Sequence, residues 1–393
     1  MTLISVTKLL FARDYFGDRL RYTRSHNKNG AADGIGPVVV WNSTKTCNLR
    51  CRHCYMESDG RKYDELSTDE AKKFIDDLAE FKVPVLLFSG GEPLLRADFF
   101  DLAAYAASKK IRPTLSTNGT LIDRATAQRI KDIGVGYVGI SLDGLSDVND
   151  KFRGVDGAYE RAMRGIENCV AVGQRVGLRF TINRHNYEEL DRIFDFIEEH
   201  QINRVCFYHL VYSGRGKNVE DITPTETRRA MDIIINRTAD FERRGLEKEI
   251  LTVDNHCDGI YLYLKALERG DEESAARIKK YIDLNGGNRS GIAFGEVDPL
   301  GNVHPDQFTQ HYTFGNVREK KFGDIWSSAE HEILRGLKDR KKLLRGRCAA
   351  CKYLENCNGN FRTRAEAVTG DYWQSDPACY LTDEEISSRP STH

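Results

Sequence analysis

The feature that most constrains this chain is a group of three cysteines near its start, Cys47, Cys51 and Cys54. Their close spacing lets one short loop place three thiolates around a single inorganic centre. A structural zinc site is closed by four protein ligands, whereas a 4Fe–4S cluster held by three cysteines keeps one iron free for a small molecule. The three-cysteine loop therefore predicts a reactive site, with a zinc loop completed by His53 or a distant cysteine as the alternative.

The run Cys47-Asn48-Leu49-Arg50-Cys51-Arg52-His53-Cys54-Tyr55 resembles the signature of the radical S-adenosylmethionine (radical SAM) enzymes. The resemblance implies that SAM chelates the open iron and that the reduced cluster splits SAM to give a 5′-deoxyadenosyl radical. Motifs in the next hundred residues, described below, favour this interpretation over zinc, because they resemble the rest of a SAM site.

Length and composition set the limits on partners. A chain of 393 residues is long enough for two domains. Its formal net charge of −1 gives no basic footprint for nucleic acid. Apolar runs such as Val83 to Phe88 are far shorter than the roughly 20 residues of a membrane helix, and no signal-peptide pattern is present. We therefore expect a cytoplasmic protein whose ten cysteines serve metal or redox chemistry.

The order of predicted elements indicates the fold class. From Pro37 to Leu210, short apolar strands alternate with amphipathic helices in six strand–helix units. This alternation predicts parallel strands joined by right-handed crossovers, and hence an α/β fold, a partial (β/α)6 barrel of the TIM type. The radical SAM resemblance implies the same core. We expect an N-terminal extension over 1–36, the barrel over 37–245, a helical linker over 246–290 and a smaller iron–sulfur domain over 291–393.

Polar motifs follow the predicted strands at their carboxyl ends, where parallel barrels carry their chemistry. Gly90-Gly91-Glu92-Pro93 resembles the family's Gly-Gly-Glu-Pro motif, which implies that the glycine backbone admits the SAM ammonium group and that Glu92 receives it. The resemblance also implies that the SAM ribose and carboxylate are held after the third and fourth strands and that Tyr55 meets the adenine. The alternative is that these polar residues cap the following helices. The residues after those two strands are Ser116, Thr117, Asn118, Ser141 and Asp143.

A second cysteine cluster lies near the C-terminus and consists of Cys348, Cys351, Cys357 and Cys379. Four thiolates at these spacings can enclose one metal centre. The region resembles the SPASM and twitch extensions of radical SAM enzymes, which implies one auxiliary 4Fe–4S cluster. A full SPASM domain has further cysteines that this chain lacks near residue 296 and at Phe361. Two alternatives remain open, a zinc knuckle and the replacement of Cys379 by His304 or His311.

The other three cysteines, Cys169, Cys206 and Cys257, are predicted to be buried thiols.

Several longer stretches resemble the haem-biosynthesis branch of the radical SAM family. They are 37–42, 84–93, 137–144, 151–154, 205–216, 304–308 and 365–381. The resemblance implies an iron-tetrapyrrole substrate in the siroheme-dependent haem pathway, 12,18-didecarboxysiroheme, which loses two acetate side chains to give Fe-coproporphyrin III. It also implies an electron donor such as ferredoxin or flavodoxin.

Several other activities remain open alternatives. Within the haem branch, they are removal of propionates on the way to haem d1 and conversion of propionates to vinyl groups. A SPASM peptide maturase is a further enzyme alternative. A zinc protein or iron–sulfur scaffold without catalysis is the alternative from another functional class.

A carboxylated substrate requires cationic partners, and four arginines lie on or near predicted strand ends. We expect two of them to face the site, with surface ion pairs as the alternative role. Three histidines are candidates for an axial iron ligand or a proton donor. The stretch 252–259 is either a source of a general acid or metal ligand, or an ordinary turn. These candidates are Arg153, Arg179, Arg184, Arg215, His209, His256 and His304.

Overall fold

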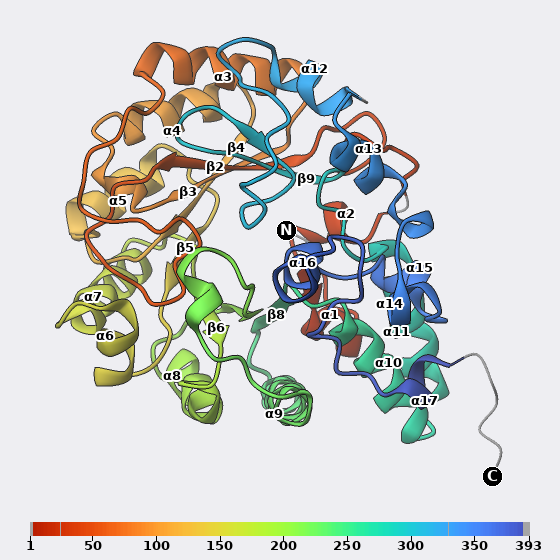
Figure 1. Cartoon of the computed structure of the whole chain (residues 1–393). Coiled ribbons are helices and arrows are strands. Elements are labelled where there is room, and N and C mark those ends of the chain that lie inside the picture. Colours follow the sequence, from red (N-terminus) through yellow and green to blue (C-terminus); the bar gives the residue numbers. More distant parts are fainter. Residues whose placement is uncertain (1–2, 24, 329, 388–393) are drawn as a thin grey trace.

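The structure, a computed structural model, describes residues 3–23, 25–328 and 330–387. In this part of the chain, ten strands form one curved sheet (Figure 1). The strands are β1 (Leu3–Ser5), β2 (Val38–Thr44), β3 (Val85–Gly90), β4 (Arg112–Thr117), β5 (Val138–Ser141), β6 (Val176–Ile182), β7 (Arg204–His209), β8 (Glu249–Val253), β9 (Phe294–Val297) and β10 (Val303–His304). Their order in the sheet is β1-β8-β7-β6-β5-β4-β3-β2-β9-β10.

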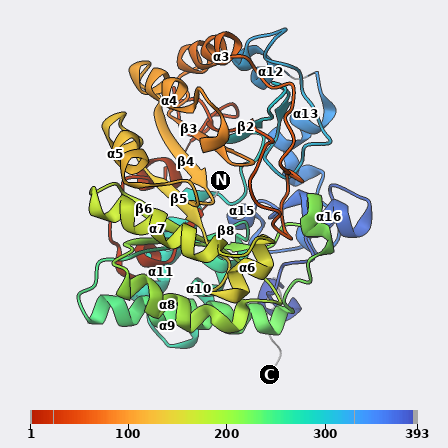
Figure 2. The same ribbon diagram turned by 90° about the vertical axis from the view of Figure 1, so that its left-hand side faces the viewer.

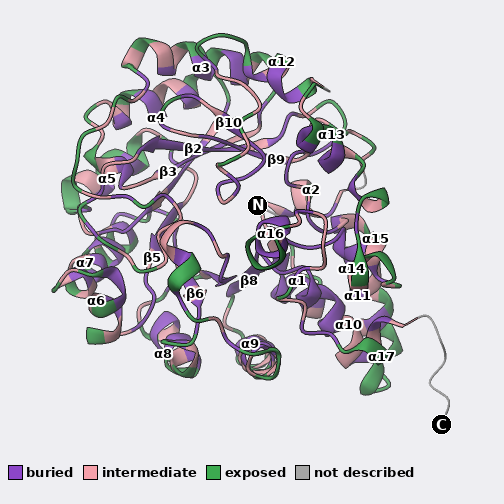
Figure 3. Cartoon of the chain, in the orientation of Figure 1, coloured by how far each residue is buried: buried purple, intermediate pink, exposed green. Residues whose placement is uncertain are grey.

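Strands β2 to β8 pair in parallel, each with the next along the chain, as the alternating pattern predicts. The connecting helices lie on the outside of the curve, and Figure 2 shows them from the side. Figure 3 shows buried residues along the strands and exposed residues on the outward helix turns. These helices are α3 (Thr68–Glu80), α4 (Phe99–Ser108), α5 (Arg124–Asp132), α6 (Asp147–Arg153), α7 (Ala158–Ala171), α8 (Leu190–Glu199) and α9 (Pro224–Arg243).

Local sequence explains where these helices begin. The Ser67 hydroxyl accepts a hydrogen bond from the Glu70 amide, and the Glu70 carboxylate accepts one from the Ser67 amide, which is a capping box. Thr223 and Glu226 form the same arrangement at the start of α9. The parallel pairing of the strands and the helices that connect them confirm the predicted α/β partial barrel with six strand–helix units.

The sheet extends beyond the prediction on both sides. The linker 246–290, expected to be helical, contains β8, which pairs in parallel with β7. The segment 1–36, expected to be a loop-rich extension, contains β1, which pairs antiparallel with β8. Around Asp298-Pro299, β9 and β10 form an antiparallel hairpin, and β9 also pairs in parallel with β2 and so continues the barrel sheet. The domain boundaries at 36, 245 and 290 stay a prediction.

The C-terminal part packs beside two long helices that follow β8, and α16 lies near the mouth of the curved sheet (Figure 1). From α16, the Arg364 guanidinium donates to the backbone oxygens of Leu210 and Asp254 at 3.2 and 2.7 Å, which ties it to the ends of β7 and β8. Within the described ranges, no helix is long and apolar enough to cross a membrane. The remaining helices are α1 (Val6–Phe11), α2 (Asp18–Arg21), α10 (Cys257–Glu268), α11 (Glu272–Asn285), α12 (Phe322–Ser327), α13 (Glu332–Lys338), α14 (Gly346–Ala349), α15 (Leu354–Cys357), α16 (Arg362–Thr369) and α17 (Asp383–Ile386), with short 3-10 turns η1 (Pro93–Leu95), η2 (Tyr187–Glu189), η3 (Gly214–Asn218) and η4 (Arg340–Lys342).

Candidate active site and second cysteine cluster

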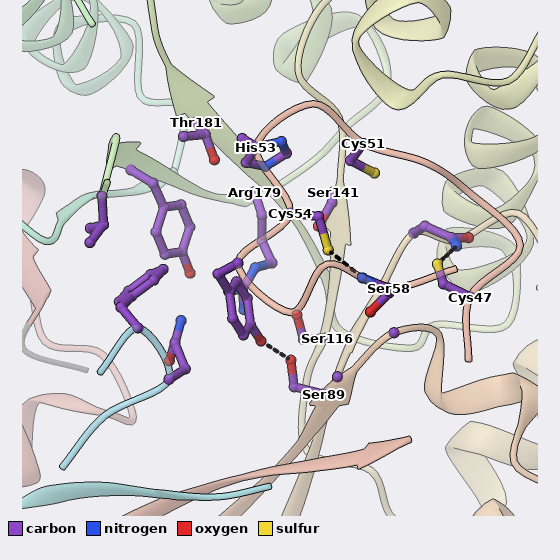
Figure 4. A pocket seen from close by; sticks show the side chains of 18 of the residues that line it. Cys47, Cys51, His53, Cys54, Ser58, Ser89, Ser116, Ser141, Arg179 and Thr181 are labelled. Carbon is purple, nitrogen blue, oxygen red and sulfur yellow. Dashed lines mark hydrogen bonds between the residues drawn. The ribbon is translucent and has the colours of Figure 1, made fainter. Parts of the chain in front are cut away.

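A cavity lies at the carboxyl ends of the parallel strands, where the sequence predicts one shared site (Figure 4). Its walls combine the cysteine loop with polar residues that follow β3, β4 and β5 and with residues of β6, β7 and the segment after β8. The predicted site residues that line it are Cys47, Cys51, Cys54, Tyr55, Gly90, Gly91, Ser116, Thr117, Asn118, Ser141, Arg153, Arg179 and His209.

Hydrogen bonds hold the cysteine loop in place. The Leu49 amide donates to the Cys47 sulfur, and the Ser58 amide donates to the Cys54 sulfur, each at 3.4 Å. Two arginines also contact Cys51: Arg215 donates to its backbone oxygen at 2.9 Å, and Arg153 approaches its sulfur at 3.5 Å. Backbone amides and guanidinium groups favour thiolates, the form in which cysteines bind metal.

Gly90 and Gly91 bring β3 against this loop. A Cβ atom on Gly90 would lie 2.2 Å from the Thr44 oxygen, and one on Gly91 would lie 2.2 Å from the Thr46 oxygen. Gly90 also has a φ of +119°, which a side chain strongly disfavours. Glycine is therefore required at both positions because two backbone segments touch there, whether or not a ligand also approaches.

Glu92 and Asp143 are fully buried and do not line the cavity. Glu92 accepts hydrogen bonds from the Thr117 hydroxyl at 2.7 Å and the Asn118 amide at 2.8 Å, which fixes the end of β4. Burial raises the pKa of Glu92 to about 7. Asp143 forms an ion pair with Arg153 and accepts from the Thr181 amide at 2.7 Å. In this structure both carboxylates hold residues of the cavity wall in place, and their direct contact with SAM remains a prediction.

Tyr55 follows Cys54 directly and lines the same cavity. Its hydroxyl donates to the Asn42 side-chain oxygen at 3.0 Å and lies 3.2 Å from the Ser89 hydroxyl. The ring also packs edge-on against Phe308, with ring centroids 5.3 Å apart. The side chain is thereby fixed, and the contact of its backbone with the adenine, which the resemblance implies, stays a prediction.

Two of the four candidate arginines reach the cavity, the number expected. Arg179 projects into it from β6, with its guanidinium 4.7 Å from the centre of the Tyr208 ring. Arg153 lies at the wall between Cys51 and Asp143. By contrast, Arg184 forms an ion pair with Glu226 on the outer side, and Arg215 is occupied by backbone oxygens of the cysteine loop.

One of the three candidate histidines lines the cavity. His209, at the end of β7, places Nε2 2.9 Å from the Asp258 carboxylate. His256 is buried elsewhere and lies beside the Asn360 side chain. The buried ring of His304 donates from Nδ1 to the Tyr312 backbone oxygen at 2.9 Å, and its Nε2 lies 3.5 Å from the Asp298 carboxylate. Both are outside the lining of this cavity, so the structure does not bring the three histidines together.

Asp254 belongs to the stretch 252–259, which the sequence marks as a source of a general acid or metal ligand or as a turn, but it was not named there as a site residue. It follows β8 directly, lines the cavity and is 2% exposed. Its φ is +66°, a left-handed conformation, and no described group hydrogen-bonds to its Oδ2. Burial raises its pKa to about 7, although Arg364 and Arg179 oppose the shift. The signal that would have placed it at a strand end is its position directly after the β-branched and apolar residues Ile250, Leu251, Thr252 and Val253.

The second cysteine cluster also comes together. Cys348, Cys351, Cys357 and Cys379 line one small cavity between α10 and the C-terminal loops. His304 and His311 lie outside that lining, and His311 instead contacts Glu366 at 2.7 Å. The geometry therefore favours Cys379 over either histidine.

The three remaining cysteines are all buried, but their surroundings differ. Cys169 and Cys206 are buried, as predicted. Cys257 is also buried, as predicted, but it lines the second cavity.

Comparison with known proteins identifies the family. Residues 41–197 match the Radical SAM superfamily, and residues 294–352 match an iron-sulfur cluster-binding domain, SPASM. An Fe-coproporphyrin III synthase from Methanosarcina barkeri is 51% identical over 395 residues, covering 98% of this chain and 99% of that protein. The chain belongs to the radical SAM superfamily. A pre-heme d1 synthase from Dinoroseobacter shibae is 43% identical over 356 residues, covering 90% of this chain and 88% of that protein.

Solved structures support the fold of this radical SAM enzyme. The crystal structure of Streptococcus suis SuiB bound to S-adenosylmethionine matches it with a TM-score of 0.70 at 18% identity, over 88% of this chain and 78% of that one. The cofactors are SAM and 4Fe–4S clusters. The residues fit them, because three thiols with polar support face one cavity and, among the described residues that line it, no fourth cysteine is present.

Proposed function

We propose that this radical SAM enzyme removes the two acetate side chains of 12,18-didecarboxysiroheme and gives Fe-coproporphyrin III. The observation that carries the proposal is the 51% identity, over nearly the whole of both chains, to a protein named Fe-coproporphyrin III synthase. The stretches that resemble the haem-biosynthesis branch include the strand ends that build the cavity, so the similarity extends to the site itself.

The cavity has the chemistry that such a substrate needs. Arg179 supplies a cation for a carboxylate, and Asp254 supplies a buried carboxyl group with an unpartnered oxygen. Leu210, Val211 and Phe308 add apolar surface for the edge of a macrocycle. In this proposal an acetate carboxylate accepts hydrogen bonds from the Arg179 guanidinium and from the protonated Asp254 carboxyl.

The remaining lining residues hold the cofactors. When bound, the first cluster and SAM supply the 5′-deoxyadenosyl radical, which breaks an unactivated bond that no side chain can attack. Cys47, Cys51 and Cys54 bind the cluster in this proposal. The polar residues after β4 and β5 orient SAM, and Tyr55 borders its adenine. His209, held by Asp258, is placed to contact the substrate iron or a proton at the cavity wall.

We further propose a one-electron donor of the ferredoxin or flavodoxin type, because each turnover of such a cluster begins with reduction. A cytoplasmic location is part of the same proposal. The ten cysteines form no disulfide with one another, and a reducing compartment keeps cysteines available to bind clusters.

The decisive experiment is a product analysis. Anaerobically reconstituted enzyme is incubated with didecarboxysiroheme, SAM and a reductant, and the tetrapyrrole is identified by mass. We expect Fe-coproporphyrin III, which has lost two acetate side chains and kept its propionates. The similarity to a pre-heme d1 synthase makes propionate removal the second candidate. A product that has lost propionates and kept its acetates would establish that candidate and refute the first.

A further inference from the structure

The second cysteine cavity contains one thiol more than a 4Fe–4S cluster needs. Cys257, the first residue of α10, is 1% exposed and lines this cavity together with Cys348, Cys351, Cys357 and Cys379. Its sulfur lies 3.4 Å from the Cys379 sulfur. Interactions with Cys357 and Cys379 raise the pKa of the Cys257 thiol, and its sulfur donates a hydrogen bond to the Cys379 sulfur.

Geometry indicates what the extra thiol does. Each iron of a cubane cluster takes one thiolate, so the ligand sulfurs stand at separate corners. Two sulfurs that are 3.4 Å apart, in contact with each other, face a single corner. Cys257 and Cys379 therefore compete for one iron and do not hold two.

We propose that Cys257 and Cys379 are alternative ligands to the same iron of the second cluster, while Cys348, Cys351 and Cys357 hold the other three. Exchange breaks the iron bond to one thiolate and forms a bond to the other. The incoming thiol gives up its proton, the outgoing thiolate takes one up, and no electron is transferred. The inference concerns this chain's cysteines and is independent of which tetrapyrrole side chain is removed.

The two sulfurs have different surroundings, so the exchange has a measurable consequence. The Arg347 guanidinium lies 3.1 Å from the Cys379 sulfur. Near the Cys257 sulfur is the neutral Asn360 amide, at 3.9 Å. A positive hydrogen-bond donor at a ligand sulfur favours the reduced, more negative cluster, so ligation by Cys379 gives the higher reduction potential.

The two ligands also belong to different parts of the fold. Cys379 sits on a C-terminal loop, whereas Cys257 begins the helix that follows β8 and Asp254. Ligation by Cys257 would therefore connect the second cluster directly to the segment that lines the SAM cavity.

The test isolates the second cluster in a chain in which Cys47, Cys51 and Cys54 are all replaced by alanine. In that background, Cys257→Ala and Cys379→Ala are made singly and together. After anaerobic reconstitution, iron and sulfide are counted and the reduced cluster is recorded by EPR. Each variant is measured again after brief oxidation, which removes an iron that has no thiolate ligand. We expect each single variant to keep four irons and the double variant, whose cluster has one open iron, to lose that iron and give a 3Fe–4S EPR signal.

Two control variants frame this result. Cys348→Ala should lose iron as a single change, because among the described residues its sulfur makes no hydrogen bond to another thiol. Cys169 is a buried thiol that lines neither cavity. Cys169→Ala should therefore leave the iron content and the EPR signal unchanged. Circular dichroism of every variant distinguishes loss of a ligand from loss of the fold.

Arg347→Gln provides a second measurement that does not depend on cluster loss. It should lower the reduction potential when Cys379 is present and leave it unchanged in Cys379→Ala protein. The proposal is overturned if Cys379→Ala alone loses as much iron as the double variant. It is also overturned if Arg347→Gln shifts the potential equally with and without Cys379.

Discussion

Replacing Asp254 by asparagine tests how the cavity binds its substrate. The carboxyl group is buried, its Oδ2 has no partner among the described groups, and burial raises its pKa to about 7. Three charged groups face it: Arg364 and Arg179 lower that pKa, and Asp306 raises it. Asparagine keeps the size and tolerates the left-handed backbone, but it stays neutral at every pH.

The effect on stability follows from the two pKa values. The pKa of Asp254 is raised in the folded chain, so its favourable contribution is complete below the ordinary value of 3.8 and is lost as pH rises through about 7. Between pH 6 and pH 8 the unfolding free energy of the wild type should fall by about 1.4 kcal/mol from this group alone. The asparagine variant lacks this loss, so its melting temperature should gain on the wild type as pH rises.

Substrate binding should also weaken as pH rises. Above pH 7, ionised Asp254 stops donating a hydrogen bond and repels the substrate carboxylate. With a pKa of about 7, the protonated fraction of Asp254 falls about tenfold between pH 6 and pH 8, so the KM of the wild type should rise by about tenfold. Asp254→Asn should show a nearly flat KM across that range, since its amide donates at both values.

The assay is the rate of tetrapyrrole product formation at saturating SAM, with melting temperatures measured in the same buffers. Asp221→Asn is the matched control, because burial also raises the pKa of Asp221 but that residue does not line the cavity. A wild-type KM that does not change with pH would refute the reasoning. So would an asparagine variant that keeps the wild-type pH dependence.

Three further predictions concern neighbouring residues. Arg179→Met should raise the substrate KM roughly 10- to 100-fold without changing the iron content, because it removes a cation from the cavity; initial rates and iron analysis check this. Arg364→Met should lower the melting temperature, since an unpaired Asp376 in the core costs about 3–5 kcal/mol, and Asp376→Asn in the same chain should restore part of it. Gly91→Ala should reduce iron uptake at the first cluster, because its Cβ would lie 2.2 Å from the Thr46 oxygen, whereas Gly134→Ala, with no atom within 4 Å, should not.

The sequence predicts the barrel well because each strand and its motif are local signals. The apolar run before Cys47, the Gly-Gly pair after β3 and the Ser67 capping box each depend on a few adjacent residues. β8 was missed because its five residues, Glu249–Val253, lie between long helices, and a short apolar run there is compatible with either structure. β1 was missed because a three-residue strand gains its stability from pairing with β8, which no local pattern shows.

The candidate site, too, could be predicted from the sequence only in part. The thiol and polar lining of the cavity follows from motifs at strand ends. The orientation of each side chain does not, because it depends on partners distant in the chain. Glu92 turns to Thr117 and Asn118, and His304 turns to Asp298. The contact between Cys257 and Cys379 joins residues 122 positions apart, so spacing rules within one motif could not reveal it.

The most direct test of the central claim, that three thiols hold a cluster with one iron open to SAM, is reductive SAM cleavage by Cys47→Ala protein. Release of 5′-deoxyadenosine and methionine is measured under anaerobic conditions with dithionite, beside the wild type and Cys169→Ala. The account predicts release by the wild type and by Cys169→Ala, and none by Cys47→Ala. Release of 5′-deoxyadenosine by Cys47→Ala at the wild-type rate would contradict it.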